Sequence, residues 1–344
     1  MNTEFHYYIT WLIAARAGLP PEDTRIVAYS SQYTDDNDII FRIDKDLPTA
    51  YGNYISQTMN ILKPRDTLLR IYPLFHFIPG DPQVAPAWRK DGAMHWLNTT
   101  PNSENANLVL DAALASGSLY RIGIACHGYA DTWAHQNFVG YYNHFNSMTD
   151  LLSAPIPNIG HAKAGHAPDR AALVWWDERL IHERIDNKAR FLAAAACMLQ
   201  KLAKYADPKM TNDELLKRET TLKDDIDRCI GGPDPENTDE DVRIARYREL
   251  SITPEYGRRE MDLYDADQWM DEAVNEDVRG LLRDRSDFVL ARWDPLKDIY
   301  TWKDRNNYKQ THWHRFQEAV KAHQNETWQI LENRSFQGLE LQNL

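Results

Sequence analysis

The stretch IACHGYADTWAHQNF, residues Ile124–Phe138, decides how the rest of the chain is interpreted. It contains His127, Asp131 and His135, each four residues from the next. Four residues make about 1.1 turns of an α-helix, so we expect the three side chains to lie on one helix face. Imidazole and carboxylate groups are ligands for zinc and similar divalent ions. The spacing therefore favours a metal or catalytic site over the alternative, a polar core satisfied by hydrogen bonds.

The composition is that of a soluble globular protein, with 344 residues, 43% of them hydrophobic and 26% charged. This length suits one large helical domain or two smaller ones. The formal net charge of −12 argues against broad electrostatic binding to nucleic acids or anionic membranes. A phosphate-bearing substrate is still possible, because bound cations can reverse the field around a site.

The cysteines and the N-terminal sequence bear on location. Three cysteines without CxxC spacing predict no disulfide framework and a reducing compartment. The first residues lack a basic n-region, and no uninterrupted 18-residue apolar run predicts a transmembrane helix. We therefore expect a cytoplasmic protein, with export by a route that reads no N-terminal signal left open.

Two helices are predicted at the start of the chain. The first covers residues 4–17, because its apolar residues follow the helical period and Gly18 ends it. His6 lies beside that apolar stripe, as a boundary residue or a ligand. The second runs from Pro21 to about residue 33. The acidic stretch 34–38 that follows is either a solvated loop or a cation site.

The middle of the chain combines an irregular segment with a long helix. Within irregular residues 48–101, residues 71–80 are expected to be a short strand or an extended buried segment. His76 in this segment is a core residue or a ligand, and His95 is a weaker candidate. After the N-cap Ser103, one long helix is predicted over residues 104–139, with three glycines that permit close approach of another helix.

The predicted fold is all-α, with three parts. Residues 1–206 form the metal-binding core, which includes a proline-rich loop with His161 and a helical region at 170–206. Residues 207–241 are read as an acidic linker or surface excursion. Residues 242–344 form a charged helical C-terminal region that packs on the core, with helices near 258–292 and 311–333.

The candidate ligands collect in the first 170 residues. They come from both N-terminal helices, the irregular segment, the long helix and the loop: His6, Asp35, His76, His127, Asp131, His135 and His161. Such a set is large enough for two divalent ions, or three. A carboxylate between two histidines on one helix is well placed to bridge ions about 3.5–4 Å apart.

This order of ligands resembles the zinc-dependent phospholipase C / P1 nuclease superfamily over roughly residues 1–200. The likeness rests on His127-x3-Asp131 with a later His161, and on the order of the other candidates. The phrases YSSQYTDD (residues 29–36), HGYADTWAH (127–135) and NIGH (158–161) also resemble an uncharacterised microbial family, DUF6765-like, which we take as a branch of that superfamily.

The resemblance implies a multi-helix enzyme with two or three clustered metal ions, most simply zinc. Two features depart from the superfamily. Its free N-terminal Trp is replaced by Met1, and its late His-x3-Glu is absent, because Gly165 stands at that spacing after His161. His166, Asp169 or an acidic residue within 177–183 is a possible replacement for that glutamate.

The leading hypothesis is a metal-dependent hydrolase of phosphoester bonds in a phospholipid, a nucleotide or a small phosphoester. By resemblance, Asp35 is a ligand or the general base toward the attacking water. The alternative is a non-catalytic, metal-stabilised helical scaffold that binds a protein partner through its C-terminal region. An HD-type phosphohydrolase ranks lower, because the chain lacks an adjacent His-Asp pair. Histidine and aspartate ligands suit Zn, Mn, Fe or Ni, so the metal stays open.

Overall fold

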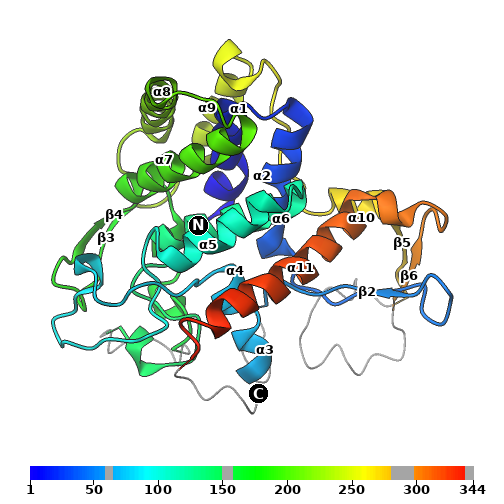
Figure 1. Cartoon of the computed structure of the whole chain (residues 1–344), viewed down its shortest axis with the longest axis horizontal. Coiled ribbons are helices and arrows are strands. Elements are labelled where there is room, and N and C mark those ends of the chain that lie inside the picture. The colour runs from blue at the N-terminus through cyan, green and yellow to red at the C-terminus, as the bar shows by residue number, and fades with distance from the viewer. Residues whose placement is uncertain (59–64, 149–157, 280–297, 338–344) are drawn as a thin grey trace.

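The computed structural model describes residues 1–58, 65–148, 158–279 and 298–337. Helices dominate this part of the chain, and two small sheets accompany them (Figure 1). The chain is therefore mostly helical, and the finer prediction of an all-α fold is not confirmed because of these sheets. No described helix is long and apolar enough to cross a membrane.

The chain begins with a rare helical form. A π-helix, η1 (Glu4–Ile9), continues directly into α1 (Thr10–Ala17), which ends at Gly18 with φ 104°. Glycine suits this left-handed position because it has no Cβ to clash. α2 (Pro21–Asp36) starts with Pro at its first position and extends beyond the predicted end. Asp35 consequently lies in the last turn of α2.

The prediction of one long helix over residues 104–139 is wrong, because this segment forms two helices. α5 (Glu104–Ala115) and α6 (Leu119–Ala134) are separated by three residues, among them Gly117 with φ 66°. The hydroxyl of Ser118 accepts the Arg121 N–H and starts α6 anew. α6 packs against α2, α5, α7 and α11, so it occupies the centre of the molecule (Figure 1).

Two glycines on α6 let neighbouring backbone approach closely, as predicted. A Cβ at Gly123 would lie 2.5 Å from the Val27 carbonyl oxygen on α2. A Cβ at Gly128 would lie 2.7 Å from the Phe75 carbonyl oxygen. These contacts bring α2 and the segment around Phe75 against the face of α6 that carries the histidines.

The segment before α5 contains short helices, α3 (Arg65–Leu69) and α4 (Tyr72–Phe75). The expected strand or extended segment at 71–80 therefore begins with a helical turn, and His76 follows that turn as its C-cap. Proline at the second position of α4 is compatible with a helix start, because the first N–H groups of a helix need no internal partner.

The helix predicted from residue 170 starts later than expected. β3 (Val174–Trp176) and β4 (Arg184–Asp186) first form an antiparallel hairpin. Branched and aromatic side chains with alternating burial favour strands here. The Asp186 carboxylate then accepts the Ala189 N–H and caps α7 (Asn187–Ala206).

The segment 207–241, predicted to be an acidic linker or surface excursion, contains a regular helix. α8 (Asn212–Ile230) starts with a capping box in which Thr211 and Glu214 satisfy each other's backbone N–H groups. It buries Leu222 and Ile226 and packs against α7 and α1. The acidic side chains thus form the solvated face of an amphipathic helix.

The C-terminal region combines helices with the larger sheet. α9 (Glu240–Ser251) is followed by α10 (Gln268–Ala273) and β5 (Val274–Asp277). The helix predicted near 258–292 is therefore only partly present. Its residues 280–292 lie outside the described part of the chain. The sheet has the order β2-β1-β6-β5, with β1 (Arg42–Ile43), β2 (Tyr51–Gly52) and β6 (Ile299–Trp302). α11 (His312–Glu332) confirms the helix predicted at 311–333.

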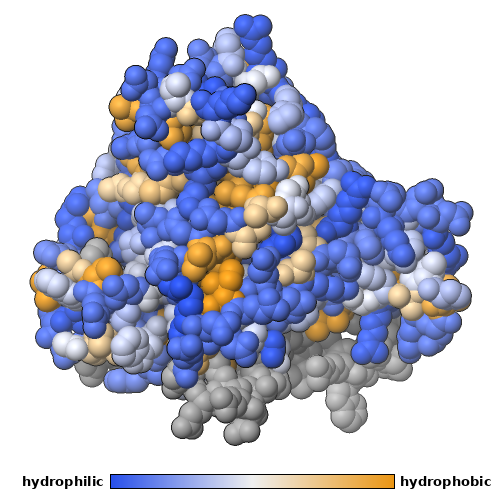
Figure 2. Space-filling model, viewed as in Figure 1, coloured by the Kyte–Doolittle hydropathy of each residue, from blue (hydrophilic) through white to orange (hydrophobic). Residues whose placement is uncertain are grey.

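One buried hydrophobic cluster joins the two ends of the described chain, from Met1 to Phe336. Through it α11 packs against α6 and α5. The exposed face drawn in Figure 2 is mostly hydrophilic, with small apolar areas between polar side chains. The C-terminal region is therefore part of the core that surrounds α6.

Candidate metal centre

All seven predicted ligands converge beside α6. Their ligand atoms form three groups, and within each group these atoms lie within 4.8 Å of one another. Group 1 contains His6, His127 and Asp131; group 2 contains Asp35, His76 and His127; group 3 contains His135, His161 and Asp169. The structure thus adds Asp169 to the predicted set.

The Asp131 carboxylate lies between the groups. Its Oδ1 is 3.2 Å from Nε2 of His6, and its Oδ2 is 3.2 Å from Nε2 of His127. The same Oδ2 is 3.5 Å from Nδ1 of His76 and 3.5 Å from Nδ1 of His135. The side chain is only 1% exposed. Asp131 therefore has the position that a bridging carboxylate needs.

Backbone carbonyls fix the protonation of the histidines. Nδ1 of His127 donates to the Ser31 carbonyl at 2.8 Å, and Nε2 of His76 donates to the Ser56 carbonyl at 2.9 Å. A carbonyl oxygen only accepts, so these ring nitrogens carry the protons. In neutral imidazoles the remaining nitrogens, Nε2 of His127 and Nδ1 of His76, are then lone-pair acceptors.

Those two acceptor nitrogens face each other at 2.9 Å. Asp35 adds a third acceptor, because its Oδ1 is 3.6 Å from each of them. Facing lone pairs repel unless a proton or a cation lies between them. Burial alone would lower the pKa of His127, but Asp35 and Asp131 outweigh burial and raise that pKa. The surroundings of group 2 thus favour a positive charge between its ligand atoms. Solvent reaches this group at Asp35, whose side chain is 28% exposed.

His6 is a completely buried imidazole whose polar atoms are not satisfied. Neither nitrogen makes a hydrogen bond of good geometry to any described residue, although Nε2 lies close to Asp131. The ring stacks on His127, with centroids 3.8 Å apart. Burial lowers the pKa of His6 to about 3, so the ring is neutral at physiological pH. A buried neutral imidazole without a well-oriented hydrogen bond is suited to bind a metal ion.

Group 3 is built on Asp169, which the sequence offered as one of several replacements for the missing glutamate. Its Oδ1 is 3.2 Å from Nε2 of His135, and its Oδ2 is 3.5 Å from Nε2 of His161. His161 donates from Nδ1 to the Gly165 carbonyl at 2.9 Å, so its Nε2 is again the acceptor. The short 3-10 turn that carries Asp169 brings this carboxylate to the cluster.

The other candidates lie outside the three groups. His166 is exposed, and Glu183 pairs with a surface lysine. Asp177 is buried, but its carboxylate accepts three hydrogen bonds from Arg179, two of them from the guanidinium. His95 packs near the ring of Phe145 instead.

The α-amino group of Met1 also reaches the cluster, which residue patterns alone did not indicate. It forms an ion pair with Asp131 and lies 3.3 Å from Oδ1 of Asp169. Burial opposes charge on this amine, but the two carboxylates outweigh it and raise its pKa to about 10. The amine therefore places positive charge between the two carboxylates.

The pKa values of the three cluster carboxylates lie below the ordinary aspartate value, which favours their ionised forms. Burial alone would raise their pKa values, but the surrounding histidines lower the pKa of Asp35, and histidines together with the Met1 amine lower those of Asp131 and Asp169. Three carboxylates and several acceptor nitrogens around one helix are a strong donor set for divalent cations.

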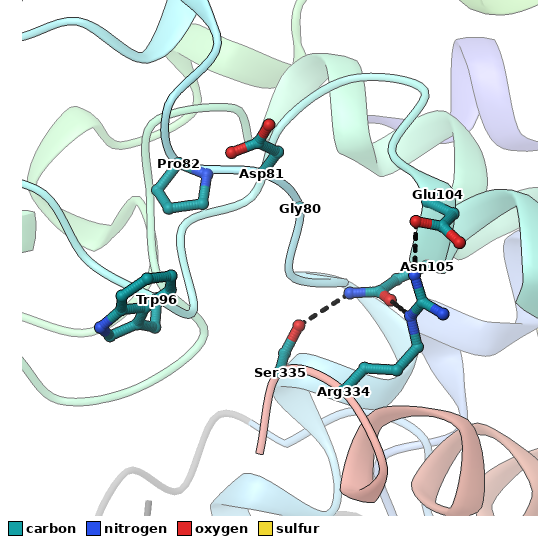
Figure 3. A pocket seen from close by; sticks show the side chains of 8 residues that line it. All are labelled: Gly80, Asp81, Pro82, Trp96, Glu104, Asn105, Arg334 and Ser335. Carbon is teal, nitrogen blue, oxygen red and sulfur yellow. Dashed lines mark hydrogen bonds and ion pairs between the residues drawn. The ribbon is translucent and has the colours of Figure 1, made fainter. Parts of the chain in front are cut away.

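A separate cavity of about 480 Å³ lies at the start of α5 and just after α11 (Figure 3). Trp96 and Asp81 line it opposite Arg334, which hydrogen-bonds Asn105 at 2.7 Å. None of the residues lining it belongs to the three groups. The histidine and carboxylate chemistry is therefore not in this cavity.

Comparison with protein families gives a match over most of the chain. The model of DUF6765, described as a family of unknown function, matches residues 1–331. No curated protein and no solved structure matches the chain.

Proposed function

The chain belongs to the DUF6765 family, and we propose that it is a hydrolase of phosphoester bonds that works with divalent cations held by the His/Asp groups beside α6. One observation carries this proposal. The nitrogens of His76 and His127 face each other at 2.9 Å as acceptors, with ionised carboxylates around them. A divalent cation would turn this repulsion into coordination.

The donor atoms support at least two cations. Nδ1 of His127 is bonded to a carbonyl, so this residue offers one nitrogen, and groups 1 and 2 share it. Group 3 has its own donors in His135, His161 and Asp169. Asp131 lies between the two ends of the cluster and is suited to bridge them. Zinc fits this nitrogen-rich set, and Mn, Fe and Ni are alternatives.

Bound cations would polarise a phosphoryl oxygen and lower the pKa of a bound water. Asp35 is placed to act on that water, because it is the most exposed carboxylate of the cluster and receives a 3.4 Å hydrogen bond from Gln57. It is therefore the candidate for the general base, or for a ligand on the solvent side. A phosphate ester would be drawn to the cations despite the acidic chain.

The first experiment is elemental analysis of protein purified without chelator, followed by assays with phosphodiester, phosphomonoester and phospholipid substrates. We expect two or more ions per chain and an activity that chelation abolishes. Asp35→Asn should lower turnover by about 10²–10⁴-fold if Asp35 is the base, with the ion of group 3 retained. Failure to take up any ion on reconstitution would contradict the proposal.

A second candidate is a metal-stabilised scaffold without catalysis, which binds a protein partner through its C-terminal region. The complete burial of His6 and His127 in group 1 favours it, because structural sites are closed and catalytic sites keep an open position. Tightly bound ions without hydrolysis of any of the three substrate classes would support this candidate over the first.

A further inference from the structure

A buried polar clamp from α9 holds the N-terminal π-helix. Arg243 donates from Nε to Oε1 of Glu4 at 2.9 Å and from Nη2 to Oε2 at 3.0 Å. The hydroxyl of Tyr247 donates to Oε1 of Glu4 at 2.8 Å. All three side chains are at most 1% exposed. We call these three residues the α9 clamp.

The clamp is itself fixed from both sides. Arg243 donates to Asp234 at 2.7 Å and to Asn237 at 2.7 Å, both in the turn before α9. On the other side, Asn2 donates from Nδ2 to Glu240 at 2.9 Å and from its backbone N–H to the Asp169 carbonyl at 3.3 Å. The first residues of the chain are thus tied both to α9 and to the segment that carries group 3.

We infer that the α9 clamp is a positioning device that sets where His6 points in group 1. His6 follows Glu4 by two residues in the same π-helix. Neither nitrogen of His6 has a good hydrogen bond to a described residue, so the placement of the ring depends on its backbone and on stacking against His127. That backbone is anchored by the His6 N–H, which donates to the Asn2 carbonyl at 3.0 Å, and by the Glu4 side chain in the preceding part of the same π-helix. π-helical turns are rare and occur frequently at functional sites.

The chemistry of the clamp favours precision over stability. A buried ion pair gives little net stability, because the cost of desolvating both charges offsets their attraction. The planar guanidinium, however, fixes a carboxylate through two parallel hydrogen bonds. A fixed geometry is what a metal ligand needs from the residues behind it. Residues that hydrogen-bond a metal ligand directly typically affect metal affinity by about 10–100-fold, and the clamp acts on His6 through the shared π-helix.

This inference rests on the proposed cation binding, and zinc titration of the full chain after chelator treatment tests it. Arg243→Lys keeps the charge but removes the fork. We expect the affinity for one ion to fall by about 10–100-fold, with the ion of group 3 unchanged as an internal reference. Tyr247→Phe leaves the Arg243–Glu4 pair intact and should weaken the same ion by a smaller factor. The Tyr247→Phe variant also tests the role of the clamp if the Arg243→Lys variant does not fold.

The matched control is Arg305→Lys. Arg305 also holds a buried carboxylate through two hydrogen bonds, to Asp44 at 2.7 and 2.9 Å, but the two residues lie in the turns that follow β6 and β1, and Arg305 is about half exposed. Its replacement should leave every zinc affinity unchanged. Unchanged zinc affinities in both clamp variants, with only a lower melting temperature, would overturn the inference. A wild-type chain that binds no zinc would overturn the proposed function itself, and the inference with it.

Discussion

The molecule contains two kinds of buried histidine, and they differ in what faces the second ring nitrogen. On α11, His323 is 1% exposed, bonds the Leu74 carbonyl through Nε2 at 3.3 Å and packs near the Phe75 ring. Beside α6, His76 and His127 are equally buried and also bond carbonyls. Their second nitrogens, however, face other acceptors, whereas His323 belongs to none of the three groups.

This difference shows which feature marks a candidate metal centre. Burial and a hydrogen bond to a carbonyl are common to both regions, so neither of them identifies a ligand. Acceptors that converge on one point without a donor between them do identify one, because such an arrangement is repulsive until a cation is present. The variants below test whether the two regions differ in metal binding as they differ in geometry.

The largest effect is expected for Asp131→Asn. This change removes a negative charge that faces four histidines, so most of the metal should be lost. A metal ion present at about 1,000 times its Kd stabilises the fold by roughly 4 kcal/mol, and this contribution is lost when the ion no longer binds. The melting temperature should then decrease by on the order of 5–10 °C. The control is Asp111→Asn, an exposed carboxylate paired with Lys201. An unchanged metal content would remove Asp131 from the site.

A more selective effect is expected for His161→Gln. Group 3 would lose one of its three donors, so the number of ions per chain should fall by one while groups 1 and 2 keep theirs. His166→Gln is the matched control, because His166 lies in the same region but is exposed and outside the groups. Elemental analysis of both variants measures the number of ions per chain and tests this prediction. Equal metal content in the two would exclude group 3 as a site.

A packing change should act on the metal centre indirectly. In Gly128→Ala the new Cβ would lie 2.7 Å from the Phe75 carbonyl oxygen, so the segment that carries His76 must shift. Overpacking of this kind typically costs about 1–3 kcal/mol, and we expect several-fold weaker metal binding as well. Gly232→Ala is the control, since no atom lies within 4 Å of its added Cβ. Denaturant unfolding and metal titration measure the two effects.

Local signals in the sequence predicted part of this architecture. Gly18 and the prolines after it correctly separate α1 from α2, and the four-residue spacing brings His127 and Asp131 together as expected. The break at Gly117 was missed, because a glycine is tolerated inside a helix and equally permits a turn. The hairpin before α7 was missed because short apolar runs do not distinguish strand from helix.

The rest of the site depends on contacts between distant segments. Asp169 reaches the cluster through a 3-10 turn, and no spacing rule selects it over its acidic neighbours. Glu4 and Arg243 are far apart in sequence, so their pairing depends on how α9 packs against the first helix. Local patterns indicate which residue types are available, whereas the packing of helices decides which of them meet.

The smallest effect, and one confined to stability, is expected for His323→Gln. Burial lowers the pKa of His323 to about 3, compared with about 6.5 when unfolded. A histidine with a lowered folded pKa stabilises the fold above pH 6.5 and loses that contribution as the pH falls from about 6.5 toward 3. The stability advantage of wild type over the variant should therefore shrink between pH 7 and pH 5, by at most about 1.4 kcal/mol per pH unit. Urea unfolding of chelator-treated protein at the two pH values measures this change. The difference includes the coupling of His323 to His127, because positive charge on His127 is one of the causes that lower the pKa of His323. The metal content at pH 7 should be unchanged. A loss of metal in the His323→Gln variant would show that a buried histidine outside the three groups is needed for metal binding. Acceptor atoms that face one another would then not be sufficient to identify the ligands.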